Sequence, residues 1–541
     1  MTLLPERYLF PATSRFNGSW WGERPREPDV AWNFDRLGSR DAWPTKYNSI
    51  ARRRLGAWPS DVFTGQHVCA VELAPEFGYG LKTMTLTEKL LARASGKANV
   101  QAGDNIWVSA DVLMTHDVCG PGTIGVFKRE FGKTAKVWDK NKIVIIPDHY
   151  IFTADSKSNR NVDILRDFVK EQDIPYFYDV IDDPNGHWHF DASKGMLNKQ
   201  YGSRYAGVCH TALPQKGHTR PGEVLFGTDS HTCMAGAFNQ FATGIGNTDA
   251  GFVMGTGKLL IKVPETMHFR LEGKLQPGVM AKDVILHCIG EIGFDGATYR
   301  AMQFDGEGVK SLSIDDRMTI ANMAIEAGGK NGIFEFDART REYVDARTKL
   351  NGTKSSYEPV ARDRDEKFVY ELVVNLDQLE PTVACHPDPG QRKKAKEMGH
   401  VKLDRAYVGS CTGGKTSDFV EFAHILRGKH VTIDTFGVPA TPEIVRDLQT
   451  TYWGNETVWQ ILVSAGVQMT ENAGCAACLG GPVDTFGRIN KSGINCISAT
   501  NRNFPGRMGD KESKVFLASP MTVAASAIAG KIVDPREYLG N

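Results

Sequence analysis

Short apolar runs alternate with longer amphipathic stretches from about residue 84 onward, and this alternation constrains the fold more than any other feature. Such runs occupy residues 105–110, 142–146, 223–227, 405–409 and 430–433, and each predicts a buried strand. Amphipathic helices are expected from residue 87 and over 161–171. Buried strands that alternate with helices are typical of an α/β protein with mainly parallel sheets.

The chain length of 541 residues allows three or four domains. We expect a leader at 1–83, followed by three α/β domains at 84–264, 265–378 and 379–541. The segment 331–379 is rich in charge, so it is predicted to be a surface excursion or a connection between domains.

The first 83 residues differ in character from the rest. They hold five of the ten tryptophans and show no persistent helical or strand period. Their arginines favour an organelle transit segment, whereas their acidic residues count against one. A transit segment and a leader without function in the mature protein both stay open.

The charge balance bears on the class of partner. Lys plus Arg and Asp plus Glu are 64 each, so the formal net charge is zero. This balance disfavours nucleic acid as a partner and favours small anions met by a few placed arginines. No run of about 18 apolar residues occurs, so no membrane span is expected. Ten cysteines in a chain this long indicate a reducing compartment rather than a disulfide scaffold.

Four segments place polar residues in a turn where an apolar run ends. They are residues 145–149, 225–231, 407–414 and 474–481. Because the carboxyl ends of parallel strands converge at one edge of a sheet, sites form there. The four segments are therefore expected to contribute to a common site.

Two of these segments carry an unusual set of cysteines. Cys475 and Cys478 form a CxxC pair, and Cys411 lies upstream among glycines. Structural zinc normally takes four ligands, and a redox pair needs no third cysteine. A [4Fe–4S] cluster held by three thiolates keeps one iron free to act as a Lewis acid. The cluster is favoured, while zinc, a redox pair and inert buried thiols remain alternatives.

The other two segments pair carboxylates with imidazoles. Asp148 precedes His149, and Asp229 lies two residues before His231. A carboxylate beside an imidazole raises its basicity and fixes its tautomer, which suits proton transfer. The alternative is that Asp and Ser at a strand-to-helix turn only cap the helix.

Two further pairs fit a site that binds acids. Arg502 and Arg507 lie on one short turn, and guanidinium groups bind carboxylates in a bidentate way. Asn322 and Glu326 lie four residues apart in a helix-like stretch, so they share one face. A solvated loop and ordinary surface polarity are the alternatives.

Together these segments resemble the aconitase superfamily, and within it the isopropylmalate dehydratase large-subunit branch of plant and algal plastids. The resemblance covers essentially all of residues 84–541. Its motifs lie at 112–117, 147–149, 227–232, 409–415, 475–478 and 501–507. One departure is Ala476–Ala477, because aconitases proper usually carry glycine first.

The resemblance implies an aconitase-like three-domain α/β/α architecture, with the active cleft at the domain junction. It implies one [4Fe–4S] cluster per subunit, bound by Cys411, Cys475 and Cys478. The implied catalytic residues are Asp148, His149, Asp229, His231 and Glu326. The implied substrate-binding residues are His116, Ser230, Asn322, Arg502 and Arg507, with His116 at a position where aconitases carry a glutamine.

The activity implied by the resemblance is that of a hydro-lyase, which isomerises isopropylmalate in leucine biosynthesis. Its substrate is a small dicarboxylic hydroxy acid, and neither nucleic acid nor a membrane is involved. Single-chain aconitases carry a further domain with a serine base, so we expect a small-subunit partner here. The expected location is the plastid stroma, or the cytoplasm if the leader is not a transit segment. Alternatives are the same chemistry on methylthioalkylmalate or homocitrate-type acids, a non-enzymatic iron or redox sensor, and a zinc-stabilised structural protein.

Overall fold

The computed structural model describes residues 83–540, which form three larger sheets and two two-stranded sheets. Nearly all of the expected leader therefore lies outside the described residues. The first helix, α1 (Leu86–Ser95), confirms the amphipathic pattern that begins at Thr87. Thr85 and Glu88 form a capping box at its start, and Gly96 ends it in a left-handed conformation.

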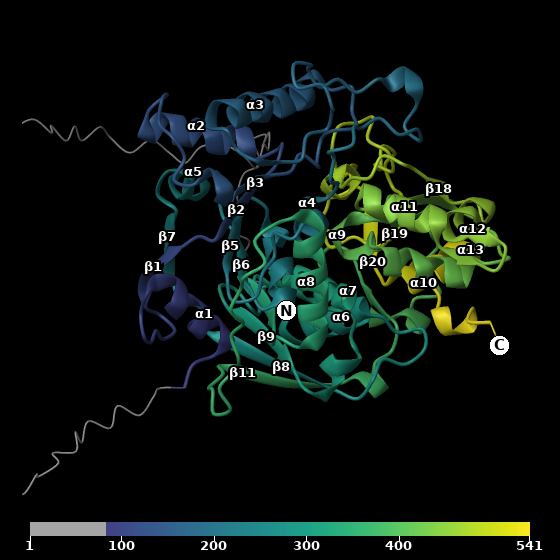
Figure 1. The fold of residues 1–541 in the computed structure, drawn as a ribbon. Helices are drawn as coiled ribbons and strands as arrows, with labels where there is room; N and C mark the ends of the chain where they lie inside the picture. Colours follow the sequence, from purple (N-terminus) through teal and green to yellow (C-terminus); the bar gives the residue numbers. More distant parts are fainter. Residues whose placement is uncertain (1–82, 541) are drawn as a thin grey trace, which may run out of the picture. The chain divides into compact units, whose positions relative to one another are not determined.

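The first large sheet has five parallel strands in the order β4-β3-β2-β5-β6. Their bounds are Val112–Thr115 for β2, Ile143–Ile145 for β3, Tyr176–Phe177 for β4, Val224–Gly227 for β5 and Phe241–Gly244 for β6. Helices α2 (Gly120–Phe131), α3 (Ser156–Gln172) and α5 (Asn247–Thr256) pack beside one another along this part of the chain (Figure 1). The residues of β2, β3 and β5 are all buried, which explains their continuous apolar runs.

The second large sheet has four parallel strands in the order β10-β9-β8-β11. Its strands are β8 (Thr266–Glu272), β9 (Ala301–Asp305), β10 (Asn331–Phe334) and β11 (Tyr370–Asn375), and its helices are α6 (Ala281–Ile292), α7 (Ile314–Asn322) and α8 (Ala338–Asn351). The prediction of a surface excursion over 331–379 is wrong. That segment holds two strands of the sheet and a helix, and every residue of β10 is buried.

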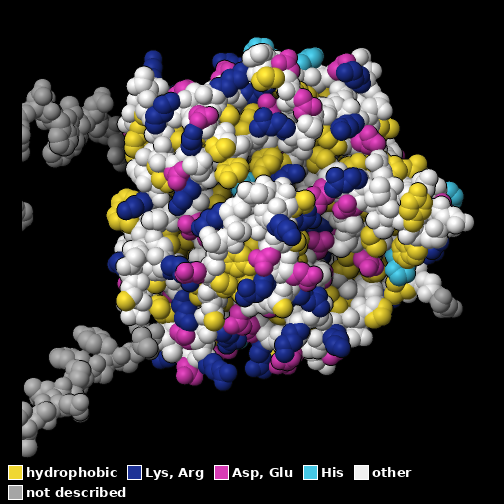
Figure 2. All heavy atoms as spheres, in the orientation of Figure 1, with side chains coloured by type: hydrophobic (Ala, Val, Ile, Leu, Met, Phe, Trp, Pro, Cys, Tyr) yellow, Lys and Arg dark blue, Asp and Glu magenta, His cyan; other side chains and the backbone are white. Residues whose placement is uncertain are grey.

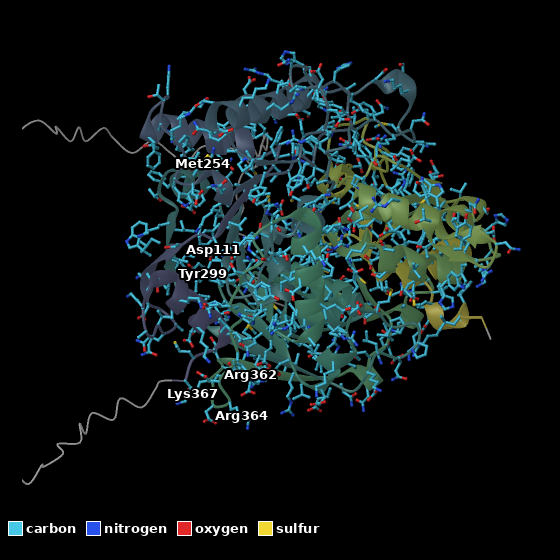
Figure 3. All side chains as sticks on the ribbon, in the orientation of Figure 1. Asp111, Met254, Tyr299, Arg362, Arg364 and Lys367 are labelled. Atoms are coloured by element: carbon cyan, nitrogen blue, oxygen red, sulfur yellow. The ribbon has the colours of Figure 1, made fainter. Side chains whose placement is uncertain are left out.

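Some of the charges that suggested an excursion form ion pairs at the end of a strand of this sheet. Arg362, labelled in Figure 3, forms an ion pair with Asp305 at the end of β9, and its Nε lies 2.8 Å from a carboxylate oxygen of Glu366. A highly charged segment can therefore contain strands of a sheet when its charged side chains form ion pairs with residues at the strand ends.

The third large sheet has seven strands in the order β13-β12-β20-β19-β14-β15-β18. The parallel strands are β14 (Arg405–Val408), β15 (Asp434–Gly437), β18 (Gln468–Met469), β19 (Asn495–Ser498) and β20 (Lys514–Leu517). The strands β12 (Thr382–Ala384) and β13 (Arg392–Lys394) run antiparallel at one edge. Its helices are α9 (Ser410–Gly413), α10 (Thr416–Leu426), α11 (Pro442–Thr450), α12 (Val458–Ser464) and α13 (Pro520–Ala529). Helix α10 packs against α12 and α13 (Figure 1).

Two strand predictions need correction. The run 105–110 does form a strand, β1 (Asn105–Ser109), but it pairs antiparallel with β7 (Lys258–Lys262) and alternates between exposed and buried residues. The predicted strand at 430–433 is displaced, because β15 begins at Asp434. Pairing of Asp434 with Arg405 on β14 sets that start, and a window of apolar residues cannot reveal it.

The α/β class with mainly parallel sheets is confirmed. The division at 264 and 378 stays a prediction, since residues 78–541 form one compact unit. Among the described helices, none is both long and apolar enough to cross a membrane. On the face drawn in Figure 2, positive and negative side chains are interspersed, which agrees with the formal charge balance.

Candidate active site

Strand ends from two sheets supply most of the predicted site residues. In the first sheet β3, β2 and β5 are adjacent and parallel, so their carboxyl ends share one edge. His116 follows β2, the pair 148–149 follows β3, and the group 229–231 follows β5. In the third sheet, Cys411 follows β14 and Arg502 follows its parallel neighbour β19.

The first histidine–carboxylate pair follows β3. Nδ1 of His149 lies 2.5 Å from Oδ1 of Asp148, and both side chains are buried. Burial alone would lower the pKa of His149, but the charge and hydrogen bond of Asp148 raise that pKa well above its ordinary value. Burial would likewise raise the pKa of Asp148, and the charge of His149 lowers it instead. The pair is therefore held as imidazolium and carboxylate.

Asp117 fixes the backbone that carries this pair. Its Oδ1 accepts hydrogen bonds from the N–H groups of Asp148 and His149, at 2.8 and 2.9 Å. Its Oδ2 accepts another from the N–H of Tyr150 at 2.8 Å. The backbone of the Asp148–His149 pair is thus held in place by a side chain from the turn after β2.

Asp229 joins three histidines. Its Oδ1 accepts a hydrogen bond from the N–H of His231 at 2.8 Å and lies 2.7 Å from Nε2 of His210. Its Oδ2 lies 3.4 Å from Nε2 of His149. Burial would raise the pKa of Asp229, but the charge of His210 and hydrogen bonds from all three histidines hold it well below its ordinary value. Asp229 also caps the 3₁₀ helix Ser230–Phe238, so the capping and charge-pairing interpretations both apply.

Glu326 contacts both His231, which follows β5 in the first sheet, and Arg502, which follows β19 in the third sheet. It lies in the 3₁₀ helix Met323–Ala327 that continues α7, and its Oε1 is 2.7 Å from Nε2 of His231. Nε of Arg502 donates to both carboxylate oxygens, at 2.9 and 2.8 Å, and Nη2 donates to Oγ of Ser230 at 3.1 Å. Burial would raise the pKa of Glu326, whereas the charge of Arg502 and the hydrogen bond from His231 lower it.

His116 stacks on His149 with ring centroids 4.1 Å apart. Burial and the charge of His149 lower the pKa of His116, so it stays neutral beside the imidazolium. Its Nε2 is buried and has no hydrogen-bond partner among the described residues. A neutral imidazole with a free nitrogen suits contact with a polar substrate group.

The three cysteines are buried and none forms a disulfide. Sγ of Cys475 and Sγ of Cys478 are 2.8 Å apart, well beyond the length of a disulfide bond. The side-chain amides of Asn322 and Asn501 both donate to Sγ of Cys411, at 3.0 and 3.3 Å. Asn322 therefore lies against a thiol.

The thiols differ in how readily they ionise. The hydrogen bond with Cys475 and the charge of Arg507 lower the pKa of Cys478 to about 6, although burial opposes the shift. Burial and then the charge of Cys478 raise the pKa of Cys411 to about 11. The charge effects place Cys411, Cys478 and Arg507 in one neighbourhood.

The surroundings of the cysteines fit an inorganic group that binds several thiolates. The hydroxyl of Tyr407 and Nε of Arg507 are buried without a partner among the described residues. Burial raises the pKa of Tyr407 well above its ordinary value, and the charges of Cys478 and Cys475 add to this effect, so its hydroxyl lies near them. Two groups of described side chains could chelate a single ion, and neither includes a cysteine. Three buried thiols beside unpartnered polar atoms are the kind of ligand set that an iron–sulfur cluster takes.

The backbone around Cys411 is shaped for close approach. Ser410 has φ of 73°, a left-handed conformation that is uncommon outside glycine. A Cβ on Gly409 would lie 2.8 Å from the carbonyl oxygen of Val438 and 2.9 Å from the ring of Tyr407. The turn after β14 thus needs glycine at 409 and presents Cys411 from a strained residue.

Sequence reasoning missed His210. It lies on α4 (Cys209–Gln215), is buried, and forms the third histidine–carboxylate pair with Asp229. No strand ends just before it, so the pattern that found the other residues does not apply. A histidine among apolar residues at a helix start was the only signal.

A model of the aconitase family (aconitate hydratase) matches residues 88–397 and 390–530, which is more than half of the chain. The chain belongs to the aconitase family. A relative from Arabidopsis thaliana, described as a chloroplastic 3-isopropylmalate dehydratase large subunit, is 55% identical over 461 residues, covering 84% of this chain and 87% of the relative.

Archaeal members of the aconitase family are also similar to this chain. A 3-isopropylmalate dehydratase large subunit 1 from Methanopyrus kandleri is 42% identical over 458 residues, covering 84% of this chain and 99% of the relative. A probable large subunit of the same enzyme from Methanothermobacter thermautotrophicus is 42% identical over 455 residues, with the same coverage. Membership of this family implies an iron–sulfur cluster, and the name of each relative implies a further subunit of that protein.

Proposed function

We propose that this chain is the large subunit of 3-isopropylmalate dehydratase, a hydro-lyase that interconverts 2-isopropylmalate and 3-isopropylmalate through 2-isopropylmaleate in leucine biosynthesis. The proposal depends most on one observation: three cysteines and three histidine–carboxylate pairs meet in a chain that is 55% identical over 461 residues to a relative of that name. Retention of all three pairs argues against a sensor, which needs only the thiolates.

Cys411, Cys475 and Cys478 would hold a [4Fe–4S] cluster, which when bound supplies a Lewis acid for the substrate hydroxyl. His149 carries the proton for the leaving hydroxyl. Its Nδ1 is held by Asp148 at 2.5 Å, so Nε2, which lies 3.4 Å from Oδ2 of Asp229, is the nitrogen that passes the proton on. His116, stacked on His149, contacts the substrate from the same side.

The substrate carboxylates are held by Arg502 and Arg507. Glu326 and Ser230 fix the guanidinium of Arg502, so it meets the substrate in one orientation. Positive charge near the carboxylate offsets the negative charge that grows when the adjacent C–H is deprotonated. A small subunit supplies the base for that deprotonation, and the two chains form a heterodimer or a larger assembly.

The experiment is co-expression with the small subunit, reconstitution with iron and sulfide, and an assay of isopropylmalate isomerisation. We expect activity only in the reconstituted complex. Full activity of the large subunit alone would contradict the need for a partner. Preference for a longer hydroxy acid with every small subunit tested would contradict the substrate.

We also propose that the mature protein acts in the plastid stroma, in line with the name of the relative from Arabidopsis thaliana. A fusion of residues 1–83 to a fluorescent protein tests this. Import into plastids with removal of the leader is expected, whereas diffuse cytoplasmic fluorescence would contradict the location.

A further inference from the structure

A fully buried lysine lies behind the Cys411 loop, and the mechanism above does not use it. Lys282, the second residue of α6, is only 1% exposed. Lysine is almost never fully buried unless its charge is paired. A cation in the first turn of a helix also meets the positive end of the helix dipole. Burial and the helix dipole therefore both disfavour a charged lysine at position 282.

The acceptors of Lys282 are neutral and belong to both loops that surround Cys411. Nζ donates to the carbonyl oxygens of Ala499, at 2.7 Å, and of Thr500. It also lies 3.5 Å from Oγ1 of Thr412, which itself donates to the carbonyl oxygen of Ala499 at 2.9 Å. One ammonium group therefore ties the turn after β14 to the segment after β19.

These two loops carry groups that face the cysteine site. Thr412 directly follows Cys411, and Thr500 directly precedes Asn501, whose amide donates to Sγ of Cys411 at 3.3 Å. The loops are also in tight contact, because a Cβ on Gly413 would lie 2.5 Å from Cβ of Ala499. A small shift between them would move Cys411 relative to Asn501 and Arg502.

Comparison with a second buried lysine shows what is unusual about Lys282. Nζ of Lys415 also reaches the Cys411 loop, at the carbonyl oxygen of Thr412, but it lies 2.7 Å from a carboxylate oxygen of Asp418. No carboxylate of residues 83–540 lies within ion-pair distance of Lys282. Burial lowers the pKa of Lys282 to about 7, and the charge of Lys415 adds to this lowering. The charges of Asp418, Cys411 and Glu326 oppose it, so the ammonium form of Lys282 is supported by several more distant groups and not by one paired carboxylate.

We propose that Lys282 is a positioning residue of the iron–sulfur site. Its hydrogen bonds hold the Cys411 loop against the Asn501–Arg502 segment, and its charge offsets the negative charge of the bound thiolates. The inference rests on the proposed function, because it requires that a cluster is bound there.

The test compares three variants of the reconstituted two-subunit complex: Lys282→Met, Lys282→Gln and, as a matched control, Lys429→Met. Lys429 also donates to two carbonyl oxygens, of Ile425 and Tyr538, but at the opposite end of α10 from the Cys411 loop. The readouts are the half-life of cluster absorbance under a chelator, the reduction potential of the cluster, and kcat and KM for isopropylmalate.

For Lys282→Met we expect a cluster half-life shorter by about tenfold, which is the factor associated with losing one hydrogen bond from a charged donor. Its reduction potential falls, because a positive charge near the cluster is lost. Lys282→Gln keeps a hydrogen-bond donor but not the charge. The reduction potential of its cluster should therefore fall as much as in Lys282→Met, while the cluster half-life and KM should change less than in Lys282→Met. Lys429→Met matches the wild type in every readout.

Wild-type half-life, potential and KM in both Lys282 variants would overturn the inference. Equal losses in Lys429→Met would also overturn it, because the effect would then be a general one on folding. If Lys282→Met does not fold, the potential and half-life of Lys282→Gln decide the matter. Failure of the proposed function is distinct, since the wild-type complex itself would then lack the cluster or the activity.

Discussion

The histidine side and the cysteine side of the site differ in how their polar groups are satisfied. On the histidine side, Asp148, Asp229 and Glu326 each have an imidazole at 2.5 to 2.7 Å. Nε2 of His116 and Nδ1 of His210 are the buried ring nitrogens there that lack a partner among the described residues. On the cysteine side, the thiols meet two amides and each other, while the hydroxyl of Tyr407 and Nε of Arg507 remain without partners among the described residues.

The difference separates the groups that the chain pairs by itself from those that require a bound partner. Buried charges are costly unless they are paired, so the histidine side is ready as a proton-handling network. Buried polar atoms without partners are rare in folded proteins, and on both sides they leave a place for an added group. In the proposed function these groups are the substrate beside His116 and an inorganic cluster beside the thiols.

Replacing one of the three thiols is expected to have the largest effect, because it removes a ligand on the cysteine side and leaves the histidine side intact. In Cys411→Ser we expect loss of the cluster and a fall in kcat/KM of about 10³-fold or more, because the Lewis acid contributes several kcal/mol. Iron content, visible absorbance and the isomerisation assay measure this. Cys496→Ser, at a buried cysteine on β19, is the matched control and should keep its colour. Full activity in a colourless Cys411→Ser complex would refute the role of the cluster.

A substitution of His149, the proposed proton donor, is expected to affect the histidine side alone. His149→Asn should lower kcat by about 10²- to 10⁴-fold while the cluster absorbance stays unchanged. His424→Asn, at an exposed residue of α10, is the control. A loss of colour in His149→Asn would show that the two sides are not independent.

A change at Glu326 tests the link between the sides. Glu326→Gln weakens the hold on Arg502 and removes the negative charge beside His231, so we expect kcat/KM to fall by roughly 10- to 100-fold. Separate kcat and KM values measure it. An increase in KM alone would assign Glu326 to arginine placement only, and no change in either constant would rule out the link.

The smallest expected effect on activity comes from a buried carboxyl group next to Lys282. Burial raises the pKa of Asp283 from 3.8 to about 7, so the folded state binds its proton more tightly than the unfolded state does. Its contribution to stability is therefore complete below pH 3.8 and is lost as the pH rises toward 7. Across that window the free energy of unfolding should fall by at most about 1.4 kcal/mol per pH unit from this group.

The variant Asp283→Asn should lack that dependence on pH and leave the isomerisation rate nearly unchanged. Urea unfolding of the cluster-free chain at several pH values measures the slope. An identical slope in the wild type and in Asp283→Asn would assign the pH dependence to other groups.

Much of the fold could be predicted because buried parallel strands have continuous apolar runs. The runs that became β3, β5 and β14 also located the turns after them. Those turns hold Asp148, His149, Asp229, Ser230, His231 and Cys411. Prediction failed where strand pairing, and not composition, decides the bounds of a strand. The start of β15 is set by its partner β14. Strand β10 lies in a highly charged segment, so its apolar residues were overlooked.

Residues whose role comes from long-range contacts could not be found in the sequence. His210 and Lys282 lie near helix starts, and each acquires its partners from segments distant in the chain. Without a local pattern, a buried histidine or lysine resembles any other. The roles assigned to Asn322 and Arg507 stay predictions, although the first contacts Cys411 and the charge of the second acts on Cys478.

The order of these residues along the chain separates the two sides of the site. All three histidine–carboxylate pairs lie before Gly474, whereas two of the three thiols and the amide of Asn501 lie after it. A chain truncated at Gly474 would therefore keep the acids and imidazoles but only one of the three sulfur ligands. The full set of thiols is present only when the chain extends past Cys478.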